Sequence, residues 1–277
     1  MTRLGNYLDN IAKGKPINFR LFLASVPDVY RSQPSRYFTS RKVGKGHIVT
    51  VIDEVVWADL KRQAVSPEDR IEAAILGDSH RARLDETFVL AFHALCPGKI
   101  PDVVYLSQQH SNLQRFKNQR TLLLLENEKN FFGYPAMFSA MEVMMSVSFS
   151  LNDTDVAFAQ GKKCTSELVM NWLDQYDAIY FAADLDLGGL TMFESLSNRL
   201  GDKVRLVQPE QLDVYEALFQ RVPEKDKDFM QAVAKARSLG FDALAETLKK
   251  CRKFMEQEAL LSLDPVKASD SLEDCSQ

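Results

Sequence analysis

Acidic side chains directly follow two apolar segments of the sequence. Glu126 follows residues 121–125 (TLLLL), and Asp184 and Asp186 follow residues 178–183 (AIYFAA). Short continuous apolar runs are typical of strands that are buried on both faces of a parallel sheet. Because ligands bind outside the carboxyl ends of such strands, we expect these three carboxylates to lie at one edge of one sheet.

Three carboxylates at one sheet edge would need a cation. Like charges that converge in an apolar setting repel one another and raise their own pKa values unless a cation neutralises them. Carboxylate oxygens favour Mg²⁺ or Mn²⁺ over softer metals. A lone D-x-D pair more often caps a helix, so the interpretation depends on its combination with Glu126. Gly188 and Gly189 add bare N–H groups where a phosphate can bind, although a tight turn alone also explains them.

Strands and helices alternate through the second half of the sequence. We predict strands at residues 121–125, 155–159, 178–183 and 203–207. We predict helices at residues 135–147, from Thr165 or Ser166 to Leu173, from Gly188-Gly189 to Leu200, and across residues 225–261. This alternation favours an α/β domain at residues 120–261, with a parallel sheet flanked by helices. Residues 262–277, rich in Ser and Asp, are predicted to be a disordered tail.

Residues 1–119 are predicted to form a smaller α+β domain. We predict a strand within residues 47–57, a helix start at Ser66-Pro67 and a helix at residues 85–95. Residues 31–46 contain no acidic side chain, and we predict a hairpin there that resembles the wing of a winged helix, gripping DNA phosphates without reading sequence. A solvated basic loop fits this composition equally well. The candidate nucleic-acid-binding residues are Arg36, Arg41, Lys42 and Lys45.

Composition excludes several classes of protein. The 277 residues carry a formal net charge of -4, so the chain as a whole is not a basic nucleic-acid coat. The four cysteines form no C-x-x-C pair, which argues against a zinc ribbon and suits a reducing compartment. The start of the sequence lacks the apolar segment of a signal peptide, and residues 136–151 are too short to span a bilayer. We therefore expect a cytoplasmic protein without a membrane partner.

The order of these motifs resembles the Toprim family of topoisomerases, primases and some nucleases. In that family a glutamate closes one strand and D-x-D closes a later one, roughly sixty residues on in this sequence. The resemblance is closer to the JetD-like nucleases of Wadjet plasmid-defence systems, relatives of the topoisomerase VI A subunit, and it covers about half of the chain. The matching features are Glu126-Asn127 followed by Phe131, Gly161 after the second strand, Asp184 and Asp186 followed by Gly189, and Glu256-Gln257-Glu258.

The resemblance implies an Mg²⁺- or Mn²⁺-dependent endonuclease that cleaves DNA in plasmid or phage defence. Asp184 and Asp186 would hold the metal, and Glu126 would be a further ligand or the general acid/base. We recognise no motif around a nucleophilic tyrosine, so we prefer attack by a metal-activated water to a covalent protein–DNA intermediate. Additional candidates for the site are Glu128, Gly189, Glu256 and Glu258.

Two alternative functions remain open from the sequence. The same carboxylates could serve an RNA-processing Toprim nuclease, and the fold could be kept in a non-catalytic subunit of a defence complex. The family resemblance also implies an SMC-like defence complex as partner and a homodimer as the assembly.

Overall fold

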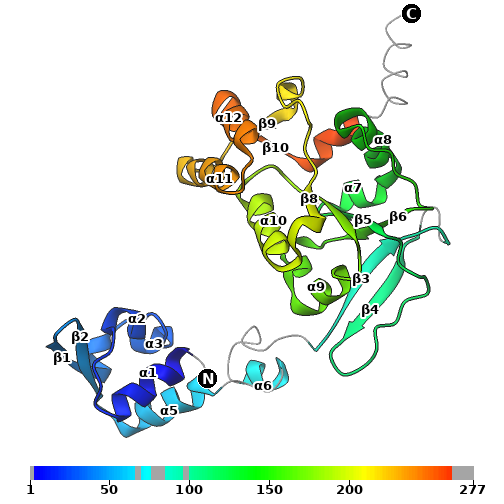
Figure 1. The fold of residues 1–277 in the computed structure, drawn as a ribbon. Coiled ribbons are helices and arrows are strands. Elements are labelled where there is room, and N and C mark those ends of the chain that lie inside the picture. The colour runs from blue at the N-terminus through cyan, green and yellow to red at the C-terminus, as the bar shows by residue number, and fades with distance from the viewer. Residues whose placement is uncertain (1–2, 66–69, 76–84, 96–99, 264–277) are drawn as a thin grey trace, which may run out of the picture. The chain divides into compact units, whose positions relative to one another are not determined.

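The structure is a computed structural model that describes residues 3–65, 70–75, 85–95 and 100–263. The chain divides into two compact units, Met1–Leu84 and Asp85–Gln277 (Figure 1). Each unit has its own hydrophobic core. No helix in the described ranges is long and apolar enough to cross a membrane.

The first unit confirms the smaller N-terminal α+β region. Strands β1 and β2 form an antiparallel hairpin, whose turn contains Gly44 in the left-handed region (φ 57°). The side chains of Phe22 and Leu60 are fully buried between this hairpin and the helices. The elements are α1 (Arg3–Ala12), α2 (Phe19–Leu23), α3 (Asp28–Arg31), α4 (Pro34–Tyr37), β1 (Phe38–Val43), β2 (Gly46–Val51), α5 (Glu54–Ala64) and α6 (Arg70–Ile75).

One prediction in this unit is half wrong. Residues 47–57 were predicted as a strand, but β2 ends at Val51 and α5 begins at Glu54. The side chain of Asp53 accepts a hydrogen bond from Val55 N (2.7 Å) and so caps α5, which outweighs the strand propensity of the valines that follow. The helix start predicted at Ser66-Pro67 lies outside the described residues.

The second unit is built on a six-stranded, mostly parallel sheet. The strand order is β4-β3-β6-β5-β7-β8, and β5 is parallel to both β6 and β7. A separate two-stranded antiparallel ribbon pairs β9 with β10. The strands are β3 (Glu86–Phe92), β4 (Asp102–Ser107), β5 (Thr121–Leu125), β6 (Thr154–Phe158), β7 (Ala178–Ala182), β8 (Val204–Leu206), β9 (Phe219–Arg221) and β10 (Phe254–Met255).

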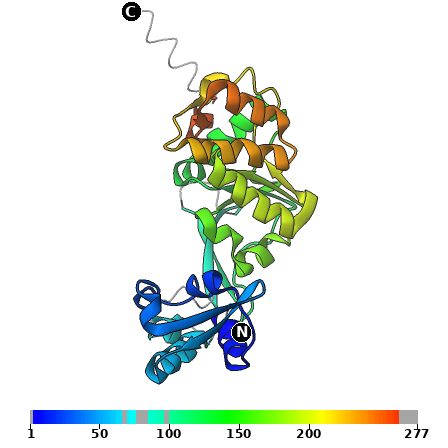
Figure 2. The same ribbon diagram turned by 90° about the vertical axis from the view of Figure 1, so that its left-hand side faces the viewer.

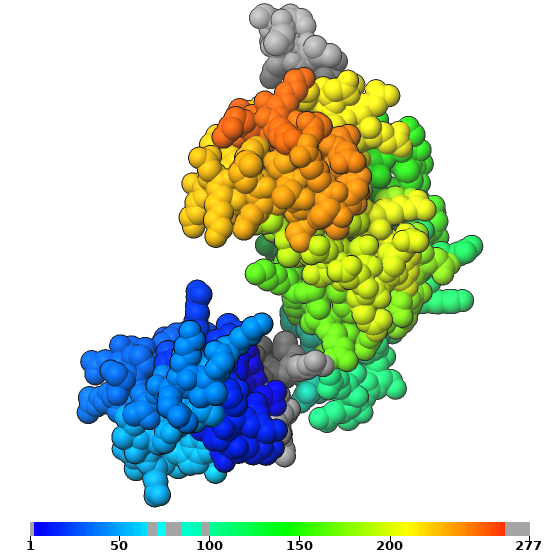
Figure 3. All heavy atoms as spheres, turned by 60° about the vertical axis from the view of Figure 1, so that its left-hand side comes forward, coloured from blue at the N-terminus to red at the C-terminus, as the bar shows by residue number. Residues whose placement is uncertain are grey.

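Helices cover both faces of this sheet. Helices α9 and α10 pack against each other on one face, and α7 and α8 lie on the other (Figure 1). Helix α11 packs on α10, and α11 and α12 lie side by side and form one continuous surface (Figures 2 and 3). The helices are α7 (Glu128–Phe132), α8 (Tyr134–Met145), η2 (Gly161–Thr165), α9 (Glu167–Leu173), α10 (Leu187–Leu200), η3 (Gly201–Lys203), η4 (Glu216–Leu218), α11 (Asp226–Ser238), α12 (Asp242–Cys251) and η5 (Gln257–Leu263).

The predicted α/β class is confirmed, with corrections to single elements. Residues 85–95 were predicted as a helix, but they contain strand β3, in which Thr87, Val89 and Ala91 alternate inward. Strands β3 and β4 were assigned to a domain ending at residue 119, whereas β3 hydrogen-bonds to β6 in the sheet of the second unit. The single helical stretch predicted at residues 225–261 is divided into α11, α12, β10 and η5. Of the tail predicted at residues 262–277, only the first two residues are described.

Candidate functional site

The site lies at the topological switch point of the sheet. The connection after β5 leads to its neighbour on one side, β6, and the connection after β6 leads to its neighbour on the other side, β7. Strand β5 lies between β6 and β7, and its last residue, Leu125, is in register with Ala182 at the end of β7. The amide of Glu126 continues this pairing by donating to Ala182 O (3.0 Å). Ligands of open α/β sheets bind at such a switch point, so both predicted acidic segments emerge at the expected edge.

Glu126 is a partly buried carboxylate directed at the segment that follows β7. Its Oε2 accepts a hydrogen bond from Asp184 N (3.4 Å). Burial raises the pKa of Glu126 to about 7, and the negative charge of Asp184 contributes further. The Glu126 carboxyl can therefore exchange a proton near neutral pH.

Asp184 is held by the C-terminal segment. Its Oδ1 accepts a hydrogen bond from Gln257 N (2.9 Å). Burial raises the pKa of Asp184 despite that hydrogen bond, and the charge of Asp186 raises it further. Asp184 Oδ2 faces Arg221 at 3.8 Å from the nearest guanidinium nitrogen.

Asp186 is the N-cap of α10. Its Oδ1 accepts a hydrogen bond from Gly189 N (2.9 Å). A Cβ on Gly189 would lie 2.0 Å from Asp184 O, so no other residue fits there without moving the D-x-D backbone. Gly189 thus allows the close approach of helix and strand end that places both aspartates.

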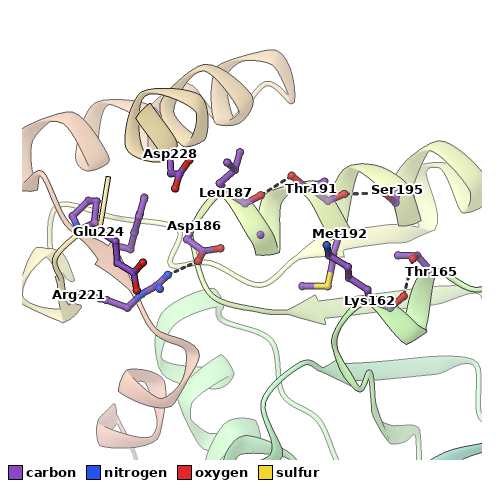
Figure 4. Close-up of a pocket in the computed structure, with 13 residues that line it drawn as sticks. Lys162, Thr165, Asp186, Leu187, Thr191, Met192, Ser195, Arg221, Glu224 and Asp228 are labelled. Carbon is purple, nitrogen blue, oxygen red and sulfur yellow. Dashed lines mark hydrogen bonds and ion pairs between the residues drawn. The ribbon is translucent and has the colours of Figure 1, made fainter. Parts of the chain in front are cut away.

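Arg221, at the end of β9, neutralises the aspartate pair. Its guanidinium hydrogen-bonds to Asp186 Oδ2 (Figure 4). Its Nε lies 3.6 Å from Glu256 Oε1. Partial burial opposes the charge of Arg221, but its bond to Asp186 and the neighbouring acids raise its pKa. No sequence motif marked this residue.

The Glu256-Gln257-Glu258 segment connects the two strand ends. The fully buried Gln257 accepts a hydrogen bond from Asn127 N (2.9 Å) through Oε1, and its carbonyl accepts one from Asn130 Nδ2 (2.8 Å). Glu258 accepts a hydrogen bond from Asn127 Nδ2. One short segment therefore fixes both Asp184 and the residue that follows Glu126.

The sequence comparison agrees with this arrangement. Residues 84–269 match the family described as Wadjet protein JetD, C-terminal. The chain belongs to the Wadjet JetD family. Membership in a plasmid-defence system implies that the protein acts in a defence complex. No curated protein matches the chain.

Most of the predicted site residues of this JetD family member lie together. Glu126, Asp184, Asp186 and Gly189 meet at the ends of β5 and β7, and the charges of Glu256 and Glu258 act on this cluster. Glu128 is exposed in the first turn of α7, and within the described residues its side chain forms no hydrogen bond or ion pair with the other site residues. The basic candidates belong to the other unit, where Arg36, Arg41, Lys42 and Lys45 are all exposed on α4, β1 and the hairpin turn.

A pocket of about 560 Å³ opens beside Asp186 (Figure 4). It lies between α10, η2 and the segment that connects β9 with α11. Its lining combines two basic side chains, three acidic ones and several hydroxyl groups. The lining residues that carry charge or a hydroxyl group are Lys162, Thr165, Asp186, Thr191, Ser195, Arg221, Glu224 and Asp228.

The donor set fits a hard divalent cation, although its oxygens are engaged by protein groups. Among the described residues, no three or more His, Cys, Asp or Glu side chains are placed so that they could hold a metal ion. In this structure Asp184 Oδ1 accepts a hydrogen bond from Gln257 N, Asp186 accepts from Gly189 N and Arg221, and Glu126 accepts from Asp184 N. Yet carboxylate oxygens are the ligands that Mg²⁺ prefers, and three such carboxylates follow the adjacent strands β5 and β7.

Proposed function

We propose that this protein is an Mg²⁺- or Mn²⁺-dependent endonuclease that hydrolyses DNA in Wadjet plasmid defence. The observation that carries the proposal is the meeting of Glu126, Asp184 and Asp186 at the carboxyl ends of two adjacent parallel strands. Membership of the JetD family supports plasmid DNA as the substrate.

Each residue of the site has a proposed role. Asp184 and Asp186 would hold the metal, which when bound supplies Lewis acidity at a phosphodiester and a water of lowered pKa. Glu126 either completes the ligand set or exchanges a proton with the attacking water or the leaving 3′ oxygen, for which its pKa of about 7 is suited. Gln257 holds Asp184 in place through its backbone N–H.

The N-terminal unit is proposed to hold the DNA backbone. Arg41 and Lys42 on β1 and Lys45 in the hairpin turn are exposed, which suits contacts with phosphates that carry no sequence information. We further propose that an SMC-like complex delivers the DNA and that a second copy of the chain completes the assembly.

A cleavage assay on supercoiled plasmid tests this function. Wild type, Asp184→Asn and Glu128→Gln are incubated with Mg²⁺ or Mn²⁺, and nicked or linear products are quantified. Wild type and Glu128→Gln should cut at similar rates, because the Glu128 side chain is exposed and forms no hydrogen bond or ion pair with the cluster in the described residues. Asp184→Asn should cut more than ~100-fold more slowly than wild type. Loss of a residue that only hydrogen-bonds to a metal ligand can already cost ~100-fold in activity, and Asp184 is a proposed ligand itself.

A parallel reaction on structured RNA separates the alternatives. Metal-dependent cleavage of RNA alone would replace DNA as the substrate. Inactivity of wild type on both nucleic acids, also with the partner complex present, would overturn the nuclease proposal and favour a binding subunit.

A further inference from the structure

Arg221 is the cation of the aspartate pair in the described part of the chain. Every ion pair that Asp184 or Asp186 makes there is with its guanidinium. The side chain stands at the end of β9, over the ring of Phe254 at 5.2 Å from the ring centroid. It is about one third exposed (35%), lines the pocket and points to the Asp186 carboxylate (Figure 4).

The hydrogen bonds of the site leave one oxygen of each aspartate for a cation. Asp184 Oδ1 and Asp186 Oδ1 accept backbone hydrogen bonds of 2.9 Å from Gln257 and Gly189. The remaining oxygens, Asp184 Oδ2 and Asp186 Oδ2, are the two that face Arg221. A metal bound through these two oxygens would take the positions beside them that the guanidinium now occupies, so Arg221 and the metal compete.

A guanidinium displaced from the aspartates can turn into the adjacent pocket. Arg221 already lines it, with Lys162 across from it and with Thr191 and Ser195 on α10. The charges of Asp186, Glu224 and Asp228 outweigh the two basic residues while no metal neutralises Asp186. A divalent cation at Asp186 would reverse that balance, and the planar guanidinium can bind a phosphate through two parallel hydrogen bonds as it binds a carboxylate.

We propose that Arg221 exchanges partners, pairing with Asp184 and Asp186 in the metal-free protein and with a substrate phosphate in the adjacent pocket once metal is bound. The inference rests on the proposed nuclease function, because that function supplies the phosphate. Arg221 thus lowers the affinity for the metal in the metal-free protein and binds the substrate phosphate in the metal-bound protein.

Metal titration tests the first half of this exchange. Purified full-length wild type, Arg221→Gln and Arg221→Lys are titrated with Mg²⁺ and, separately, Mn²⁺, and the apparent Kd is taken from calorimetry and from the metal-dependent rise in Tm. Arg221→Gln should bind metal about tenfold tighter than wild type, within the ~5–150-fold range of typical couplings between sites. Arg221→Lys keeps the charge and should remain close to wild type.

Two further variants act as controls. Arg205, like Arg221, lies over an aromatic ring, but the ring is that of Tyr180, whose hydroxyl it also hydrogen-bonds (3.0 Å). Because Arg205 forms no ion pair with the aspartates in the described residues, Arg205→Gln should leave the metal Kd unchanged. Asp186→Asn should abolish metal binding. Equal metal affinity of wild type and Arg221→Gln, or weaker binding by Arg221→Gln, would overturn the exchange while leaving the metal site in place.

Cleavage at saturating metal tests the second half. Arg221→Gln should cut plasmid at least tenfold more slowly than Arg205→Gln although its metal site is full. Normal cleavage by Arg221→Gln would overturn the phosphate role. If wild type binds metal at Asp186 but cuts no nucleic acid, the nuclease proposal and the phosphate role fail, and the metal affinities alone decide whether Arg221 competes.

Discussion

Replacing Glu126 by glutamine should stabilise the metal-free protein at pH 8. The pKa of Glu126 is raised from 4.5 to about 7 by burial and by the charge of Asp184. That difference sets an upper limit of about 3 kcal/mol at ~1.36 kcal/mol per pKa unit, and solvent screening of the partly exposed carboxylate reduces the stability gained below that limit. Glutamine is neutral and nearly isosteric, and its oxygen can still accept the hydrogen bond from Asp184 N.

The direction of the pH dependence follows from the raised pKa. Because the folded protein holds this proton more tightly than the unfolded chain, ionisation of Glu126 costs stability as the pH rises from about 4.5 to about 7. Below this window both side chains are neutral, and the two proteins should unfold alike. Above it, the advantage of Glu126→Gln should reach its full size.

Urea unfolding without metal at pH 5, 6, 7 and 8 measures the effect. The sequence has two tryptophans, so a Trp57→Phe background leaves buried Trp172 in α9 as the fluorescent reporter of the second unit. Glu128→Gln is the matched control, because Glu128 is exposed two residues away. Saturating Mg²⁺ should stabilise wild type at pH 8 and remove most of the difference.

Equal stability of wild type and Glu126→Gln across this pH range would refute the reasoning. If wild type and Glu126→Gln differ by less than about 0.5 kcal/mol at both pH 5 and pH 8, ionisation of Glu126 is not costly in the folded protein. If Glu128→Gln gains as much stability as Glu126→Gln, the effect comes from net charge and not from the site.

Two more results are expected. Gly189→Ala should lower the free energy of unfolding by about 2–4 kcal/mol and abolish cleavage, because its Cβ would lie 2.0 Å from Asp184 O. The control is Gly188→Ala, whose Cβ would meet only the Asp186 side chain at 3.2 Å. This variant should lower the free energy of unfolding by about 1 kcal/mol or less. Urea unfolding compares the two, and similar losses would contradict the packing argument. Arg41→Gln and Lys42→Gln should each weaken DNA binding and reduce the slope of log K against log salt by about 1, measured by fluorescence anisotropy between 50 and 200 mM salt; unchanged slopes would exclude the hairpin as a phosphate contact.

The central part of the sheet could be predicted because its signal is local. The runs TLLLL and AIYFAA form β5 and β7, whose residues from Leu122 and Ile179 onward are fully or almost fully buried. A continuous apolar run of this length fits a strand covered by helices on both faces. The acids that end these runs therefore lie at a predictable sheet edge, although their role in binding metal stays a prediction.

Other elements depend on contacts that no local pattern encodes. The sequence pattern predicts a helix over residues 85–95, where the structure has β3. The positions of the apolar residues there do not distinguish the helical period from the strand period, and only the pairing with β4 and β6 identifies the strand. Arg221 ends a strand of three residues, and β10, with which it pairs, has two. Elements this short carry no periodic signal, so the cation of the site could be found only in the folded chain.

The contact between Gln257 and the two strand ends has a consequence for the order of synthesis. Gln257 lies 73 residues after Asp184 and 130 residues after Asn127, both of which it hydrogen-bonds. A chain emerging from the ribosome exposes the carboxylates of β5 and β7 well before the segment that orients them has been made. Contacts between residues so far apart in the sequence form slowly. A nascent chain that has not yet reached Gln257 lacks both the N–H group that holds Asp184 and the side-chain oxygen that accepts from Asn127 N.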